Sequence, residues 1–358
     1  MTHYDPAHVF RQLSAEGTRR IDAFVFELMF RRRLNKIVGN TPGLTVSFGW
    51  HLGYNKYGLP AYWFRLLDED GDWNSCDDAM LARLAAFRIG RYDNPVNVIR
   101  VKYDEPSGAL VASSRAGMQW VNWKPLTAVL DRLPSRGAPV APKPMDNTSP
   151  ERAIAAFAWL AKEEFRHELI ALSIQRRFMN CVLRPHLGRD GTDLDAVILT
   201  ADGQLCAVEF KRKYPSVGRQ VFGLDEFPHV RTVRTMDQLG IRNLHIMLVS
   251  PVWNKNESPV TWLSEKSLYP NWTWVAACLK GEDFPEDANC MHTSGEDSGQ
   301  RKAERDQGSI KWEKIYLLNE GIRLSRKASA DLVKLVTHGT IGEAVRVSYD
   351  DLFSRKLG

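Results

Sequence analysis

Two short apolar runs joined by a tight polar turn, between positions 194 and 211, constrain the fold most strongly. The runs read LDAVILT and LCAVEFK, and the turn between them, ADGQ, contains Asp202 and Gly203. An Asp-Gly pair between apolar runs is typical of a tight β-hairpin. The sequence therefore predicts two antiparallel strands, at 194–200 and 205–211, and with them a β-sheet.

The segments around this hairpin predict alternating helices and strands. A helix is expected from about 150 to 179, followed by a short strand near 181–187. After the hairpin, a helix is expected at 228–240 and an apolar strand at 244–250. The predicted order is helix, three strands, helix, strand, which indicates an α/β fold with a mixed sheet flanked by helices.

One carboxylate falls on the apolar side of the leading helix. At 100° per residue, Glu168 lies within the arc formed by the apolar residues Ile154, Ala158, Ala161, Phe165, Leu169 and Leu172. A carboxylate on a buried face needs a partner or a function.

Charged side chains gather at one face of the hairpin. Because side chains alternate along a strand, Glu209 and Lys211 share a face, as do Asp193 and Asp195 on the preceding strand. Adjacent strands lie only about 4.8 Å apart, so we expect these groups to converge. Neighbouring carboxylates repel unless one takes up a proton or a cation lies between them. Oxygen ligands of this kind suit Mg²⁺ or Mn²⁺ and would support phosphodiester hydrolysis.

These residues resemble a known family. Asp195 directly before AVIL, followed fourteen residues later by Glu209, Phe210 and Lys211, is similar to the motif of the PD-(D/E)xK nuclease superfamily, the restriction-endonuclease-like fold. The resemblance covers roughly residues 150–252. Leu194 stands where the family has its proline, and Glu209 to Lys211 is the only Glu-x-Lys in the chain.

The resemblance implies a role for each residue of the motif. Asp195 and Glu209 would bind the metal ion, and Lys211 would assist the attacking water. Asp193 competes with Asp195 as the metal ligand; we prefer Asp195 because it directly precedes the apolar strand. Glu168 matches the glutamate that many members add from the leading helix. The implied activity is that of a Mg²⁺-dependent endonuclease acting on DNA.

Basic residues surround the motif. Arg212 and Lys213 follow it, and Arg231 and Arg234 recur at helical spacing in the next helix. We interpret these four as candidates for binding nucleic-acid phosphates, although a solvated basic face explains them equally well. His229 is a further candidate to assist the reaction, and a structural histidine is the alternative.

A proline-rich segment suggests a domain boundary. Residues 134–149, together with Pro150, hold five of the eighteen prolines and read as a semi-rigid linker. Residues 1–133 are then expected to form an α+β domain that selects the substrate or a partner. Within it we expect a helix at 10–37, strands at 43–51, 61–67 and 96–103, and a helix near 77–88 started by Ser75 and Asp78. Arg31, Arg32 and Arg33 are interpreted as the positive end of the first helix, with contact to a phosphate backbone as the alternative.

The nuclease core is expected at 150–255 and a C-terminal extension at 256–358. The segment 281–308 is polar and of mixed charge, and we expect a mobile insertion there, followed by a strand over IKWEKIYLL and a helix over RKASADLVKLVTH.

The composition is that of an ordinary globular chain, and its net charge of +5 is mild. The five cysteines are scattered without a C-x-x-C pair, and neither a signal sequence nor an apolar run of membrane-spanning length is present, so a cytoplasmic location and no membrane association are expected. Expected partners are DNA and either a second copy of the chain or another protein bound through the N-terminal domain. Two alternatives remain: a nuclease-fold module that binds nucleic acid or protein without cleaving, and a structural α/β protein in which Glu209 and Lys211 simply pair.

Overall fold

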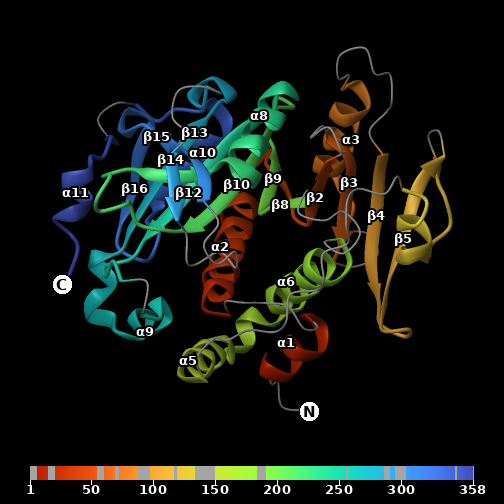
Figure 1. The fold of residues 1–358 in the computed structure, drawn as a ribbon, viewed down its shortest axis with the longest axis horizontal. Helices are drawn as coiled ribbons and strands as arrows, with labels where there is room; N and C mark the ends of the chain where they lie inside the picture. Colours follow the sequence, from red (N-terminus) through yellow and green to blue (C-terminus); the bar gives the residue numbers. More distant parts are fainter. Residues whose placement is uncertain are drawn as a thin grey trace. The chain divides into compact units, whose positions relative to one another are not determined.

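The computed structural model shows a mixed α/β protein made of two compact units, Met1–Leu199 and Thr200–Gly358 (Figure 1). The structure describes residues 6–14, 21–54, 60–68, 72–87, 97–116, 119–133, 150–183, 191–254, 257–285, 291–294, 304–342 and 345–357. The expected linker at 134–149 lies outside these residues, and the division between the units falls within the predicted hairpin.

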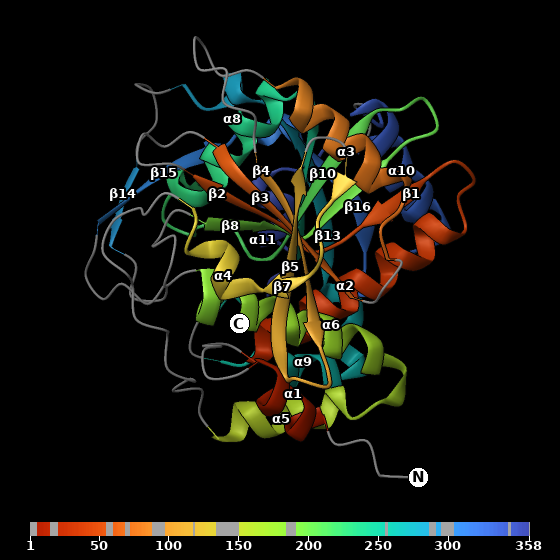
Figure 2. The ribbon, with the colours of Figure 1, turned by 90° about the vertical axis from the view of Figure 1, so that its right-hand side faces the viewer.

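The first unit is built on a sheet with the strand order β6-β5-β4-β3-β2-β8, in which β3 and β4 run parallel and the other pairs run antiparallel. β3, β4 and β5 lie side by side (Figure 1), and β5 is nearest the viewer when the molecule is turned (Figure 2). A separate antiparallel pair joins β1 and β9, and β7 pairs with β5. The strands are β1 (Thr45–Ser47), β2 (Trp50–Tyr54), β3 (Pro60–Leu67), β4 (Asn97–Asp104), β5 (Ala109–Ala116), β6 (Gln119–Trp120), β7 (Lys124–Pro125), β8 (Gly191–Leu194) and β9 (Ala196–Leu199).

Helices surround this sheet. They are α1 (Pro6–Ser14), α2 (Ile21–Gly39), α3 (Ser75–Ala86), α4 (Leu126–Leu130), α5 (Pro150–Leu160) and α6 (Arg166–Arg177), with short turns at η1 (Glu163–Phe165) and η2 (Phe178–Leu183). One core joins Phe64 of β3 and Ile99 of β4 to Ile174 of α6 and to Phe178. The burial of these apolar side chains is the main force that holds the helices on the sheet.

Strand and helix are also linked by a buried polar network. Arg65 on β3 donates to Asp77 over 2.8 Å, and the indole of Trp50 donates to the same carboxylate over 3.0 Å. Asn74 caps α3 in a reciprocal capping box with Asp77, so the expected cap at Ser75 with Asp78 is displaced by one residue. Trp50 of β2 and Trp63 of β3 are fully buried, so these aromatic side chains belong to the core.

The second unit contains a four-strand sheet in the order β10 (Leu205–Arg212), β12 (Arg242–Val249), β13 (Thr273–Leu279) and β16 (Ile315–Glu320). β10 and β12 are parallel, and the other neighbours are antiparallel. The connection from β10 to β12 includes α8 (Arg231–Gln238), and α10 (Arg326–His338) contacts the sheet. Parallel neighbours require such a crossover connection.

A smaller antiparallel sheet joins β11 (Phe222–Asp225), β15 (Glu304–Ile310) and β14 (Met291–Ser294). The segment expected to be a mobile insertion therefore contains two paired strands. Phe222 and Ile310 from this sheet enter the same core as Met247 and Val275. The remaining short elements are η3 (Glu226–Val230), α9 (Pro259–Ser264), η4 (Lys266–Asn271), η5 (Gly281–Asp283), η6 (Trp312–Lys314) and α11 (Tyr349–Phe353).

Two local predictions are wrong. The helix expected from about 150 to 179 is interrupted after Leu160, and Ile154, which was placed on its apolar face, is 68% exposed. A π-helical turn occupies 178–183, where a strand was expected to begin at 181, and residues 184–190 lie outside the described part. In both places tertiary packing overrides the local sequence pattern: α5 packs against α2, and the turn at 178–183 packs against β8.

The three arginines at 31–33 do not end a helix. α2 continues to Gly39, and Arg31 is buried, paired with Asp68 and lying 4.3 Å from the ring centre of Phe48. Arg32 donates to the backbone carbonyl of Glu164. Within the first unit, Arg31 therefore links α2 to the end of β3, and Arg32 links α2 to η1. None of the helices in the described residues is both long and apolar enough to span a membrane.

Candidate active site

The centre of the candidate site is an ion pair on β10. The Nζ atom of Lys211 lies 2.5 Å from Oε1 of Glu209, and the two side chains share one face of the strand because they are two residues apart. The Glu209 side chain is 14% exposed and that of Lys211 is 37% exposed. This confirms that Glu209 and Lys211 share one strand face, and the ion pair is also what the alternative of a structural α/β protein predicts.

Two histidines complete this group. His229, in η3, places its Nδ1 atom 3.3 Å from the same Oε1 of Glu209. His245 lies opposite Glu209 in the parallel β10–β12 register and is buried. Tertiary structure thus adds two imidazoles from different elements to the predicted Glu-Lys pair.

The charges of this group follow from its surroundings. Burial alone would raise the pKa of Glu209, but Lys211 and the hydrogen bond from His229 outweigh it, so the pKa of this carboxyl lies well below its usual range. Burial lowers the pKa of His245 to about 3, against the opposing effect of Glu209. At neutral pH the site therefore holds an ionised carboxylate beside a neutral buried imidazole.

An ionised carboxylate is the donor that a hard divalent cation requires. Within the described residues, however, no group of three or more His, Cys, Asp or Glu side chains is placed to hold a metal ion. Mg²⁺ is commonly held by only one or two carboxylates, with water and substrate phosphate oxygens as the other ligands. The donor chemistry of Glu209 fits such an ion, although Lys211 and His229 both contact its Oε1 atom.

The two aspartates of the motif belong to the first unit. Asp193 lies in β8 opposite His51 of β2, and Asp195 lies at the bend between β8 and β9. Arg176 on α6 pairs with Glu27. Burial would lower the pKa of Arg176, but Glu27, Asp193 and Asp195 raise it, so both aspartates act on this guanidinium.

Asp195 and Glu209 fall in different compact units. Their sharing of one cation stays a prediction from the sequence, as does the preference for Asp195 over Asp193.

Glu168 is buried, as its position on the helical arc indicates. It lies in the first turn of α6, with Oε2 3.8 Å from the Nη1 atom of Arg32 on α2. This distance is within ion-pair range but beyond a hydrogen bond, and Oε2 has no hydrogen-bond partner among the described residues. Glu168 thus has a structural partner, and a role in metal binding stays a prediction.

The four basic residues expected to bind nucleic acid have different surroundings. Lys213 donates to the carbonyl of Gly223, and Arg234 pairs with Glu226 over 2.5 Å and with the carbonyl of Phe284 over 2.7 Å. Arg231 lies 5.2 Å from the ring centre of Phe227, and Arg212 ends β10 and is half-buried. Lys213 and Arg234 therefore have roles in holding the second unit together.

A further cationic and aromatic face, absent from the sequence analysis, occurs on β4 of the first unit. The guanidinium of Arg100 lies 4.1 Å from the ring centre of Trp120 and 5.3 Å from that of Trp123. Lys102, two residues along the same strand, lies 4.9 Å from Trp123. The spacing of Arg100 and Lys102 marks one strand face, but only the fold brings the tryptophans to it.

His245 was also missed. Its signal in the sequence is weak, because it is a single histidine within the apolar run LHIMLVS, where a buried structural role is the usual explanation.

Comparison with known proteins identifies no relative: neither a family model, nor a curated protein, nor a solved structure matches the chain.

Proposed function

We propose that this protein is a Mg²⁺-dependent nuclease that hydrolyses phosphodiester bonds in DNA. The observation that carries the proposal is the pairing of Glu209 with Lys211 on one strand face, with the carboxylate held ionised. The order of elements along the chain is consistent with it, because α6, β8, β9, β10, α8 and β12 occur in the order of the restriction-endonuclease-like fold that the motif resembles, although β11 lies between β10 and α8 and β8 pairs with β2 in a different sheet. The parallel pairing of β10 with β12 across α8 also suits that fold.

In this proposal each side chain has a defined task. Glu209 supplies a charged oxygen ligand, and Lys211 supplies an ammonium group that neutralises charge on a phosphate oxygen or positions the attacking water. His229 donates to Glu209 and fixes its orientation. A bound Mg²⁺ ion would provide a water of lowered pKa and stabilise negative charge on the phosphate. Asp195 is the proposed second carboxylate ligand, with Asp193 as its alternative and Glu168 as an additional acid.

The test is conversion of supercoiled plasmid to nicked or linear forms by the full chain. We expect cleavage with Mg²⁺ or Mn²⁺, none with EDTA, and none for Lys211→Ala or Asp195→Ala. The Glu265→Gln variant is a matched control, because Glu265 is an exposed acid of the second unit. Cleavage that persists in EDTA and in the Lys211→Ala variant would refute the proposed chemistry.

A second candidate function has its own support. Lys211 forms an ion pair with Glu209 and His229 contacts the same oxygen, which suits a module that keeps the fold but binds nucleic acid or a protein partner without cleaving. Such a module would retard DNA in a gel shift with strong salt dependence and would give no metal-dependent nicking. Nicking that requires Glu209 would exclude it.

We further propose that the first unit selects the nucleic acid. Arg100 and Lys102 offer positive charge beside Trp120 and Trp123, a combination that suits phosphates and stacked bases of a single strand. Arg100→Ala with Lys102→Ala should weaken binding of single-stranded oligonucleotides. Unchanged binding would remove this surface from the proposal.

A further inference from the structure

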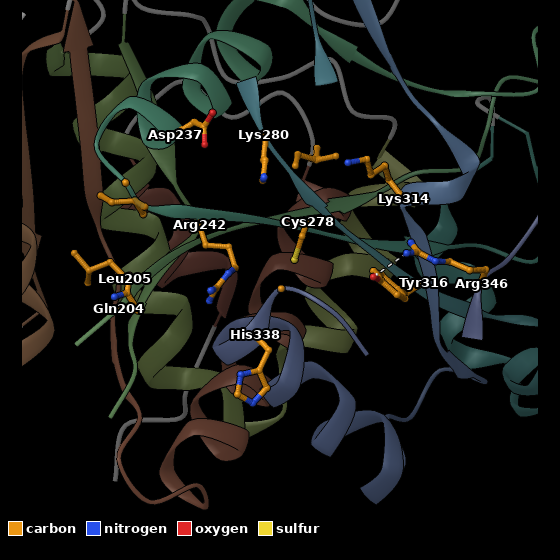
Figure 3. A pocket seen from close by; sticks show the side chains of 14 residues that line it. Gln204, Leu205, Asp237, Arg242, Cys278, Lys280, Lys314, Tyr316, His338 and Arg346 are labelled. Atoms are coloured by element: carbon orange, nitrogen blue, oxygen red, sulfur yellow. Dashed lines mark hydrogen bonds between the residues drawn. The ribbon is translucent and has the colours of Figure 1, made fainter. Parts of the chain in front are cut away.

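A cavity of about 470 Å³ lies in the second unit, at the end of the sheet where β10 and β12 begin. It is lined by side chains from β12, β13, β16 and the end of α10 (Figure 3). Glu209 lies three residues beyond Cys206, the register partner of Arg242, which corresponds to roughly 10 Å along the strand. The cavity is therefore separate from the Glu209–Lys211 pair.

The lining is strongly cationic. Arg242, Lys280, Lys314 and Arg346 line the cavity, whereas Asp237 is the one carboxylate among the described lining residues. Figure 3 shows the charged ends of Lys280, Lys314 and Arg346 directed toward the space around Cys278. Burial raises the pKa of Cys278 to about 11, so its thiol adds no negative charge at neutral pH.

Most of these cations already have partners within the described residues. Lys314 pairs with Asp283 over 3.0 Å, and Lys280 lies 3.4 Å from Glu282. Arg242 donates to the carbonyl of Val336 at the end of α10. Arg346 lies over the ring of Tyr316 and donates to its hydroxyl through Nη2 over 2.9 Å.

The Nη1 atom of Arg346 is buried and has no hydrogen-bond partner among the described residues. A buried guanidinium N–H without an acceptor destabilises the folded state, because it has lost its hydrogen bond to water and no protein group replaces it. Arg346 lines the cavity, so an anion bound there would supply that acceptor after a small rotation of the guanidinium group.

We propose that this cavity binds a small phosphorylated molecule, with its phosphate between Arg346 and Arg242 and with Lys280 and Lys314 adding positive charge. Guanidinium groups match the geometry of phosphate oxygens and bind them with paired hydrogen bonds. A volume of about 470 Å³ is within the range of pockets for ligands of nucleotide size, roughly 300–1,000 Å³. A cavity of this size accommodates a free phosphorylated compound. This inference is independent of the proposed nuclease activity.

The test is isothermal titration of the full chain with inorganic phosphate, pyrophosphate and adenosine triphosphate, without divalent metal and without DNA. We expect at least one of the three to bind. We expect Arg346→Ala and the rim variant Lys280→Glu each to weaken binding about tenfold or more, which is the scale of one lost charge-assisted hydrogen bond. Lys280→Glu changes an exposed side chain, so it remains informative if Arg346→Ala does not fold.

Two control variants test whether binding depends on the cavity or on cationic side chains elsewhere in the protein. Arg326→Ala removes an exposed arginine in the first turn of α10 and should leave the affinity unchanged. Lys211→Ala should also leave it unchanged, whereas it should abolish nicking if the nuclease proposal holds. The inference is overturned if none of the three compounds binds, or if both cavity variants bind like the wild type.

Discussion

Lys211 and Glu209 form an ion pair on one face of β10, with Nζ 2.5 Å from Oε1. Because both side chains lie on one face of one strand, the backbone places them within reach of each other. His229 contacts the same carboxylate oxygen, so Glu209 is held from two elements.

The first prediction concerns Glu209. Glu209→Gln keeps the shape of the side chain but removes the charge that a divalent ion requires. We expect Mg²⁺-dependent plasmid cleavage to fall by about a hundredfold or more, the scale seen when one electrostatic group of an active site is lost. The rate of nicking measures the effect, with circular dichroism to show that the variant is folded. A variant that is folded and fully active would remove Glu209 from the site.

The second prediction concerns pH and His245. The pKa of His245 is about 3 in the folded protein and about 6.5 in the unfolded chain. Between pH 3 and pH 6.5 the unfolded chain therefore binds a proton that the folded protein does not. The free energy of unfolding should therefore decrease as pH falls below about 6.5, by about 1.4 kcal/mol per pH unit from this group, until pH approaches 3.

Urea titrations from pH 7 to pH 4 measure this slope. His245→Gln should make it shallower, whereas His338→Gln, at the end of α10, should not. Equal slopes for the wild type and His245→Gln would contradict the prediction.

The third prediction concerns Arg176 and Glu27 in the first unit. Arg176→Met leaves Glu27 without its partner and removes the positive charge that acts on Asp193 and Asp195. We expect the free energy of unfolding to decrease by about 2–3 kcal/mol, somewhat less than for a fully buried pair. Combining it with Glu27→Gln should cost clearly less than the sum of the single changes, and a double-mutant cycle in urea measures this difference. Additive effects would show that the pair contributes no coupling.

The fourth prediction concerns Gly339, which ends α10 with a φ of 75°. A Cβ atom there would lie 3.2 Å from Nε of Arg242, so Gly339→Ala combines backbone strain with a close contact. We expect a loss of about 1–2 kcal/mol from the backbone and an additional loss from displacing Arg242. Gly203→Ala is the matched control, because its φ is 78° and, its chain neighbours aside, no atom of the described residues lies within 4 Å of the added Cβ. Thermal unfolding should show a larger decrease in melting temperature for Gly339→Ala than for Gly203→Ala.

Several elements could be predicted from local patterns alone. The strand at 205–211, the apolar strand at 244–250 and the helix over RKASADLVKLVTH correspond to β10, β12 and α10. In each of these segments the spacing of the apolar residues matches the face that the fold buries. The segment 281–308 was misjudged because its strands carry few apolar side chains. They are stabilised by pairing with each other and with β11, which lies far away in the sequence.

The sequence by itself determined that Glu209 and Lys211 share a face of the strand, because side chains two positions apart on a strand point to the same side. Only the tertiary structure placed His229 and His245 around Glu209, since their positions depend on the crossover through α8 and on the register of β12 against β10. The same holds for the cationic cavity, whose charged residues come from four separate segments of the chain. Local sequence fixes the direction of neighbouring side chains, whereas contacts between distant segments depend on how whole elements pack.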